Sequence, residues 1–170
     1  MNPTVNLRLP AAERRRQLLD TALPVFAAKG FHAASMNDVA DAAGVTKPVL
    51  YQHFVSKRQL YLELLDDVGT RLGSRLAEAT RSAETPHQQV AQGFAAYFHF
   101  VADERDAYQL LFGGGTRRDA EFAEAVREVE GQLAATIAAL IDADLDLDPE
   151  LLAREVADLA WAGLRGVHRV

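Results

Sequence analysis

Several polar and basic side chains between residues 46 and 57 are of the types that contact nucleic acid. Lys47 can reach the acceptors of guanine in the major groove, and Gln52 can pair with adenine. Pro48 and Val49 can either touch a thymine methyl group or serve only to start a helix. Hydroxyl, imidazole and ammonium groups nearby can hold phosphate oxygens and so fix the register of a protein on DNA. The residues that carry these groups are Ser35, Thr46, Tyr51, His53 and Lys57.

Two short helical patterns, separated by a glycine, position these side chains. The apolar residues of the first pattern recur at helical spacing: Met36, Val39, Ala40 and Ala43. Gly44 ends the first helix, and the Thr46 hydroxyl can cap the second. Leu50 and Phe54 then face inward, so the other residues of the second helix point outward. This arrangement predicts a DNA-reading helix-turn-helix.

A resemblance to the TetR family of bacterial transcriptional regulators lies in the run GVTKPVLYQHFVSK, and it extends over about residues 13–64. Beyond Leu64 it is one of architecture only. The resemblance implies an N-terminal domain that reads an operator, a larger helical domain that senses a ligand, and dimerisation through the last two long helices. It also implies phosphate contacts at the five positions given above. Ala34 stands where such sequences often carry Thr, so Ser35 is expected to make that contact instead.

The distribution of charge agrees with DNA binding by one end of the chain. The net charge is −6, yet residues 1–60 carry eight Lys or Arg and only four Asp or Glu. The remaining residues carry ten basic and twenty acidic side chains. A basic end joined to an acidic remainder favours contact with nucleic acid at that end. The alternative is that charge simply varies along the chain.

Other classes of function lack a pattern in this sequence. There is no cysteine, the histidines show no metal-ligand spacing, and no nucleophile or phosphate-binding motif indicates a catalytic residue. The acidic stretch around residues 142–150 is interpreted as a solvated linker. No apolar run approaches the length that spans a bilayer, and no export signal precedes the first helix. We therefore expect a soluble cytoplasmic protein that is not an enzyme and binds no metal, cofactor or membrane.

Helical spacing recurs along the rest of the chain and predicts an all-α fold. Expected helices cover residues 11–29, 36–43, 46–54, 56–81, 86–102, 106–112, 119–141 and 149–170. Pro24 lies inside the first of these and predicts a bend near Asp20 to Pro24. The last pattern runs into Val170 without a stop signal, as in a frayed terminus or in a chain cut before a further helix.

Two domains are expected: residues 1–56, with a disordered start at about 1–9, form the helix-turn-helix domain, and residues 57–170 form the effector-binding and dimerisation domain. Aromatic residues of the second domain predict a pocket for a small apolar or aromatic effector, although a packed core would use the same residues. The residues are Phe94, Tyr97, Phe98, Tyr108, Phe112, Phe122 and Trp161.

The sequence thus favours a homodimeric regulator that binds a palindromic, double-stranded operator and releases it when a small molecule binds. Two other classes stay open. One is a helical ligand-binding protein or enzyme that retains the helix pair as structure only, and the other is a module that binds a protein through the same surface. Salt-dependent binding to duplex DNA separates the first class from both alternatives.

Overall fold

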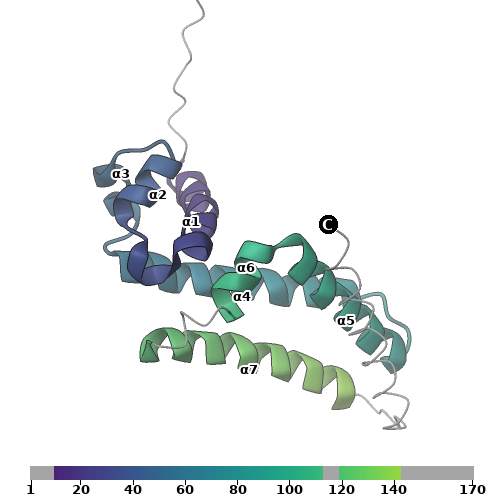
Figure 1. The fold of residues 1–170 in the computed structure, drawn as a ribbon. Coiled ribbons are helices and arrows are strands. Elements are labelled where there is room, and N and C mark those ends of the chain that lie inside the picture. Colours follow the sequence, from purple (N-terminus) through teal and green to yellow (C-terminus); the bar gives the residue numbers. More distant parts are fainter. Residues whose placement is uncertain (1–9, 113–118, 143–170) are drawn as a thin grey trace, which may run out of the picture. The chain divides into compact units, whose positions relative to one another are not determined.

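The computed structural model describes residues 10–112 and 119–142, and within these ranges every regular element is a helix (Figure 1). The helices are α1 (Ala11–Ala33), α2 (Met36–Ala42), α3 (Lys47–His53), α4 (Lys57–Thr80), α5 (Pro86–Asp103), α6 (Arg105–Phe112) and α7 (Ala120–Asp142). The predicted all-α class is confirmed. Across the same ranges, no helix has the length and apolarity that crossing a bilayer requires.

The chain divides into two compact units, Met1–Leu64 (unit 1) and Leu65–Val170 (unit 2). The division falls within α4, whereas the sequence predicts a boundary between residues 56 and 57, and that boundary stays a prediction. The expected disordered start and the expected last helix from about residue 149 lie outside the described residues.

Helix α1 is regular over most of its length and has a break in its backbone at Gly30. One face of α1 is buried, through Leu18, Leu19, Ala22 and Phe26. Its backbone angles stay helical through Pro24 and depart at Gly30, which has φ 72° and ψ 165°, a region open essentially to glycine. The sequence predicts a bend near Asp20 to Pro24, and this prediction is wrong. The break in helical geometry lies at Gly30. Asp20 and Pro24 are both exposed, so water can reach the carbonyl that the proline leaves without a donor.

Local hydrogen bonds define both ends of α2. The Ser35 hydroxyl accepts the Asp38 N–H at 3.1 Å, and the Asp38 carboxylate accepts the Ser35 N–H at 2.8 Å, which forms a capping box. At the other end, Gly44 has a left-handed φ of 64°, and the Val45 N–H donates to the Ala40 carbonyl at 3.0 Å. These are features of a Schellman motif. The predicted end of this helix at Gly44 is confirmed.

Unit 1 buries an apolar core to which all of its helices contribute. Its aromatic members are Phe26, Phe54 and Tyr61, and the rings of Phe26 and Tyr61 meet edge to face with centroids 5.1 Å apart. The remaining core residues of α2, α3 and the start of α4 are Met36, Val39, Ala40, Leu50, Leu60 and Leu64. Within this core, α2 packs against α1 and α3 packs against α2.

The long helix α4 follows the predicted pattern. Ser56 precedes it, and the Ser56 hydroxyl accepts the Gln59 N–H at 3.1 Å, as a cap does. Five apolar residues at near-helical spacing are all buried: Leu60, Leu64, Val68, Leu72 and Leu76. The predicted helix from Ser56 to about Arg81 is confirmed as Lys57–Thr80.

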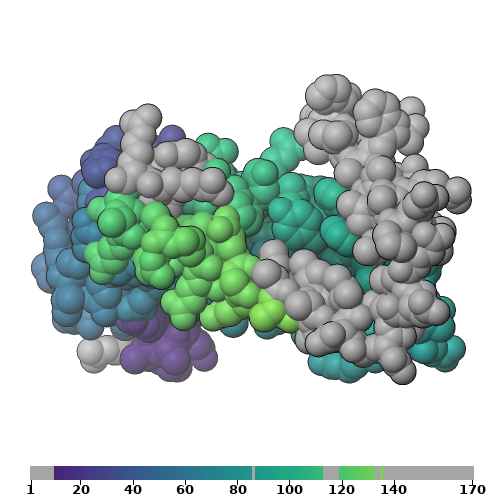
Figure 2. Space-filling view, turned by 90° about the horizontal axis from the view of Figure 1, so that it is seen from below, coloured from purple at the N-terminus to yellow at the C-terminus, as the bar shows by residue number. Residues whose placement is uncertain are grey.

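Helices α5, α6 and α7 and the second part of α4 form the described portion of unit 2. Its buried residues include Phe100, Ala107, Leu110, Leu111, Phe122, Val126 and Val129. Helix α7, coloured green, contributes to the surface in Figure 2. Its exposed residues include Glu124, Arg127 and Glu128. The hydroxyl of Thr85 caps α5 by accepting the Gln88 N–H at 3.2 Å.

A network of ion pairs joins α4 to the junction of α5 and α6. Glu104 accepts from Arg71 Nη1 at 2.5 Å and from Arg75 Nη2 at 2.7 Å. Arg71 also lies 3.2 Å from an Asp67 oxygen, and the Arg75 guanidinium is 5.6 Å from the centre of the Phe100 ring. Because two arginines share one half-buried carboxylate, this network fixes α4 against the α5–α6 corner more firmly than isolated surface pairs would.

A close approach of α4 and α7 occurs at Gly69. A Cβ atom there would lie 2.5 Å from Val129 Cγ2 and 3.0 Å from its Cγ1, whereas a Cβ at Gly73 would meet nothing within 4 Å. Valine is stiff at χ1 and cannot easily move aside. We expect Gly69→Ala to lower the free energy of unfolding by about 1 kcal/mol, since overpacking outweighs the gain in helix propensity.

The control is Gly73→Ala, which should raise the free energy of unfolding by about 0.5–1 kcal/mol, because helix propensity improves and nothing is displaced. Urea denaturation measures the free energy of unfolding of both variants. Adding Val129→Ala to Gly69→Ala should remove the overpacking term in a double-mutant cycle. Equal effects at the two glycines would show that α7 does not contact Gly69.

Candidate nucleic-acid interface

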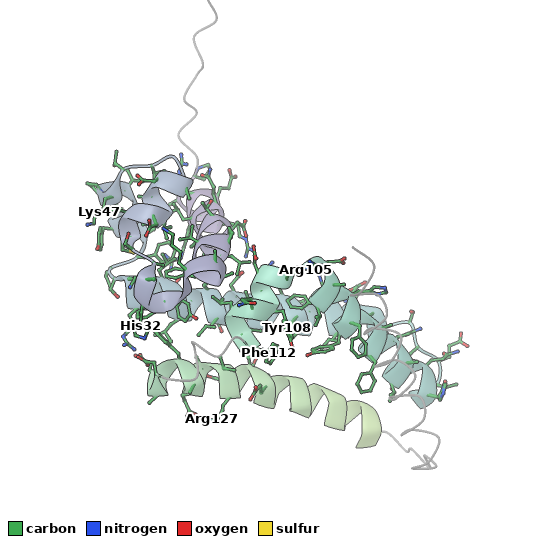
Figure 3. All side chains as sticks on the ribbon, in the orientation of Figure 1. His32, Lys47, Arg105, Tyr108, Phe112 and Arg127 are labelled. Atoms are coloured by element: carbon green, nitrogen blue, oxygen red, sulfur yellow. The ribbon has the colours of Figure 1, made fainter. Side chains whose placement is uncertain are left out.

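The third helix presents the side chains that the sequence predicts to contact bases. Lys47, Pro48 and Gln52 are exposed, and Tyr51 is 41% exposed. Figure 3 shows Lys47 at the outer end of α3. Its ammonium lies 6.0 Å from the Tyr51 ring, and among the described residues it has no acidic partner. Lys47 and Gln52 are therefore available to a ligand.

Val49 and His53 differ from the rest of this group, because both are half-buried rather than fully outward. Leu50 is completely buried and anchors the inner side of α3. Val49 and His53 thus lie at the edge of the exposed surface, and their predicted contacts with a thymine methyl and a phosphate stay predictions.

Thr46 precedes α3, but its hydroxyl does not cap the helix as expected. The reason is chemical. Pro48 has no N–H to donate, and the Val49 N–H already donates to the Thr46 carbonyl at 3.0 Å. The exposed Thr46 hydroxyl is consequently left for other partners, which suits the predicted contact with phosphate.

Ser35 is exposed, but its side chain is engaged in the protein. The hydroxyl donates to Asp38 Oδ2 at 2.7 Å in addition to accepting the Asp38 N–H. Lys29 Nζ lies 2.7 Å from Asp38 Oδ1, and this ammonium, together with Ser35, lowers the pKa of Asp38 to about 2. Asp38 therefore stays ionised near neutral pH, and the hydroxyl proton of Ser35 is committed to it. The phosphate contact of Ser35 stays a prediction.

The Lys57 ammonium points into unit 1 and not outward, contrary to expectation. It donates to the carbonyls of Phe31 at 2.7 Å and Ala34 at 2.8 Å, and it lies 3.5 Å from that of His32. It is also 4.4 Å from the centre of the Phe31 ring. Because these carbonyls follow the break at Gly30, Lys57 satisfies backbone acceptors at the end of α1. No local pattern in the sequence indicates this role of Lys57, because the carbonyls it binds lie more than 20 positions away in the chain.

The three adjacent arginines also bind within unit 1. Arg14 Nη1 donates to Gln17 at 2.6 Å, and Arg16 Nη2 donates to Asp20 at 2.6 Å, both along the exposed side of α1. Arg15 instead donates to the His53 carbonyl and to the Glu63 carboxylate, which lie on other helices. No pattern in the sequence distinguished Arg15 from its neighbours.

In unit 2, the predicted effector residues are found in several different environments. Phe122 is buried, Phe94 is half-buried, and Trp161 lies outside the described residues. The other four form two ring pairs: Tyr97 with Phe98, at 5.6 Å, and Tyr108 with Phe112, at 5.1 Å. Tyr108 and Phe112 belong to α6 (Figure 3). Burial, with a smaller effect of Tyr108, raises the pKa of Tyr97, which indicates that its hydroxyl stays protonated.

A hollow of about 360 Å³ lies elsewhere in unit 2, between α4 and α7. Its lining is composed of Gly69, Thr70, Leu72, Gly73, Ser74, Ala77, Val129 and Gln132, and it includes none of the predicted effector residues. No group of three or more potential metal ligands occurs within residues 10–112 and 119–142.

Comparison with known proteins agrees with this geometry. The family model for bacterial regulatory proteins of the tetR family matches residues 18–64. The transcriptional activator FasR of Mycolicibacterium smegmatis is 47% identical over 91 residues, which are 54% of this chain and 42% of FasR. The repressor KstR2 of the same organism is 37% identical over 87 residues, which are 51% of this chain and 42% of KstR2. The chain thus spans less than half the length of these curated relatives.

Similarity to solved structures covers more of the chain. A TetR-like transcriptional regulator from Rhodococcus sp. RHA1 is 30% identical, with a TM-score of 0.72 over 92% of this chain and 85% of that protein. KstR2 of Mycobacterium tuberculosis is 25% identical, with a TM-score of 0.65 over 89% of this chain and 82% of that one. This chain belongs to the TetR family of bacterial transcriptional regulators.

Proposed function

We propose that this protein regulates transcription by binding a specific double-stranded operator through α3. The observation that carries the proposal is the exposure of Lys47 and Gln52. Both are exposed on a helix whose inner side is anchored by Leu50, and Lys47 has no acidic partner among the described residues. Groups that are free on a fixed helix can form bidentate contacts with base edges.

The contacts divide by chemistry. Lys47 and Gln52 read bases, while Pro48 and Val49 touch thymine methyl groups. Thr46, Tyr51 and His53 hold phosphates and fix the register. For Ser35 and Lys57, a phosphate contact requires sharing or exchanging the internal hydrogen bonds described above. Residues 1–56 form the DNA-binding domain in this proposal, and residues 57–170 bind the effector and the second subunit.

A homodimer places two recognition helices about a two-fold axis. The bound site is then an inverted repeat with half-site centres about 34–36 Å apart or somewhat more. Selection from random duplex oligonucleotides tests this directly, with sedimentation to measure the oligomeric state. An inverted repeat whose affinity falls steeply with salt supports the proposal. Failure to enrich any duplex would contradict it and favour a protein-binding or purely structural use of the helix pair.

The proposed regulator acts in the cytoplasm and has no catalytic role. Matching relatives include both an activator, FasR, and repressors, the KstR2 proteins. We favour a repressor that releases its operator on binding a ligand. A reporter gene placed behind the selected operator distinguishes the two signs of regulation.

A small apolar or aromatic molecule is the proposed effector, and it binds among the aromatic residues of α5 and α6. FadR of Bacillus subtilis, solved in complex with stearoyl-CoA, shares the fold at 18% identity, so its ligand enters only as one probe. Because α4 contains residues of both units, we propose that ligand binding changes operator affinity through a movement of this helix. Within this helix, Gly69 packs closely against Val129.

We expect a ligand found by thermal-shift screening of metabolites, including acyl-CoAs, to lower operator affinity about five-fold or more, equivalent to roughly 1 kcal/mol of coupling. Tyr97→Ala or Phe112→Ala should weaken this response and leave operator binding without ligand unchanged. Titrations of labelled operator measure both. A screen in which no compound changes thermal stability or operator affinity would mean that unit 2 serves as a scaffold.

A further inference from the structure

The guanidinium group of Arg15 lies where three helices of unit 1 meet. It belongs to α1, it donates from Nη1 to the His53 carbonyl at the end of α3, and it donates from Nη2 to the Glu63 carboxylate in α4. Its Cζ atom is 4.4 Å from the centre of the Phe54 ring, which is completely buried. One side chain therefore connects α1, the end of α3 and α4.

The third helix has few other restraints. It is seven residues long, Leu50 is its only buried residue, and no side chain caps its start. The last carbonyls of a helix lack donors within the helix, and a positive charge is favourable there. A guanidinium group can serve two acceptors at a fixed angle, which an ammonium group does less well. At His53, Arg15 supplies both a hydrogen-bond donor for the carbonyl and a positive charge at the C-terminal end of α3.

We propose that Arg15 is a positioning residue for DNA recognition: it holds the C-terminal end of α3 in place, so that Lys47 and Gln52 meet the bases in register, and it does not itself bind DNA. The proposal rests on the function proposed above, in which α3 reads the operator. The competing role for an arginine in a basic domain is direct contact with phosphate.

The neighbouring arginine supplies a matched control. Arg16 carries the same charge in the same helix and forms an ion pair with Asp20 of α1, at 2.6 Å. Arg16→Gln therefore removes one positive charge from unit 1 while the contacts of Arg15 with His53 and Glu63 stay in place. Arg15→Lys keeps the charge but loses the planar fork, so it separates geometry from charge.

Amide hydrogen exchange on the free protein tests the effect on α3 without DNA. The Leu50 N–H donates to the Thr46 carbonyl at 3.2 Å, and the Phe54 N–H donates to the Leu50 carbonyl at 3.0 Å. Exchange of these two amides should be about ten-fold faster in both Arg15→Gln and Arg15→Lys, as loss of a charge-assisted hydrogen bond implies. Arg16→Gln should leave it unchanged. Uniform acceleration throughout unit 1, or equal effects of Arg15→Gln and Arg16→Gln, would overturn the proposal.

Binding to the selected operator and to an unrelated duplex then separates positioning from phosphate contact. At a temperature where all variants are folded, the ratio of the two affinities should fall about ten-fold in both Arg15 variants, with an unchanged salt slope. Equal loss for both duplexes, with a slope shallower by about one unit per subunit in Arg15→Gln, would identify a phosphate contact and overturn the proposal. If the unmodified protein binds no duplex, the proposed function fails, and the exchange result alone decides whether Arg15 positions α3.

Discussion

Replacing Lys47 by alanine is expected to lower operator affinity about 30-fold or more. Each half-site loses a base contact worth about 1–3 kcal/mol, and a dimer loses it twice. The selected sequence should also lose its preference at one base position in each half-site. Titration of labelled operator measures the affinity, and a repeated selection with the variant measures the preference.

Arg16→Ala is the control for loss of a positive charge, because the Arg16 side chain bonds to Asp20 along α1. It should reduce affinity for all sequences slightly and leave the selected motif intact. If Lys47→Ala also returns the original motif, Lys47 contacts only phosphate or does not contact DNA, and base reading by α3 would rest on Gln52.

Lys57→Ala is expected to lower the free energy of unfolding of the DNA-binding unit by about 2–3 kcal/mol in the absence of DNA. The physical reason is that the ammonium satisfies carbonyls that follow the break at Gly30, including those of Phe31 and Ala34. Hydrogen bonds to a charged group contribute about 1.5–3 kcal/mol, and groups left without a partner add a penalty. Urea denaturation followed by circular dichroism measures the change.

Lys29→Ala provides the comparison, since it removes the same charge from a more exposed pair with Asp38, and water and salt screen exposed pairs so that they add little stability. A loss in Lys57→Ala no larger than in Lys29→Ala would return Lys57 to the role of a phosphate contact. If Lys57→Ala loses more free energy of unfolding than Lys29→Ala, weaker operator binding by Lys57→Ala can result from lower stability of the DNA-binding unit as well as from loss of a phosphate contact.

The helices were predictable because their signals are local. The buried stripe of α4 and the capping by Ser56 follow from apolar spacing and from hydroxyl chemistry. The behaviour of Thr46 was also within reach, since Pro48 in the first turn removes a donor that the hydroxyl needs. The capping box of Ser35 and Asp38 is likewise visible as a spacing of three residues.

Contacts between helices were not predictable from one sequence. Arg15 and Lys57 look like surface charges until the end of α3 and the end of α1 are placed beside them. The role of Gly69 was not predictable either. A glycine within a helix suggests flexibility, whereas the contact of Gly69 with Val129 shows close packing. Periodicity identifies the buried face of a helix but does not identify the partner that covers it. The site residues themselves stay predictions until DNA is bound.

Two of the long-range contacts of unit 1 also bear on how the unit folds and unfolds. The most extensive helix packing in this unit joins helices that are consecutive in the chain, α1 with α2 and α2 with α3, and such local topologies fold quickly. The Arg15–Glu63 and Lys57–Phe31 contacts instead join residues 48 and 26 positions apart. Contacts of this kind close large loops, and we expect them to form after the folding transition state. Their loss should then accelerate unfolding and leave the folding rate nearly unchanged. On this expectation, the two side chains affect the lifetime of the folded unit more than the speed at which it forms.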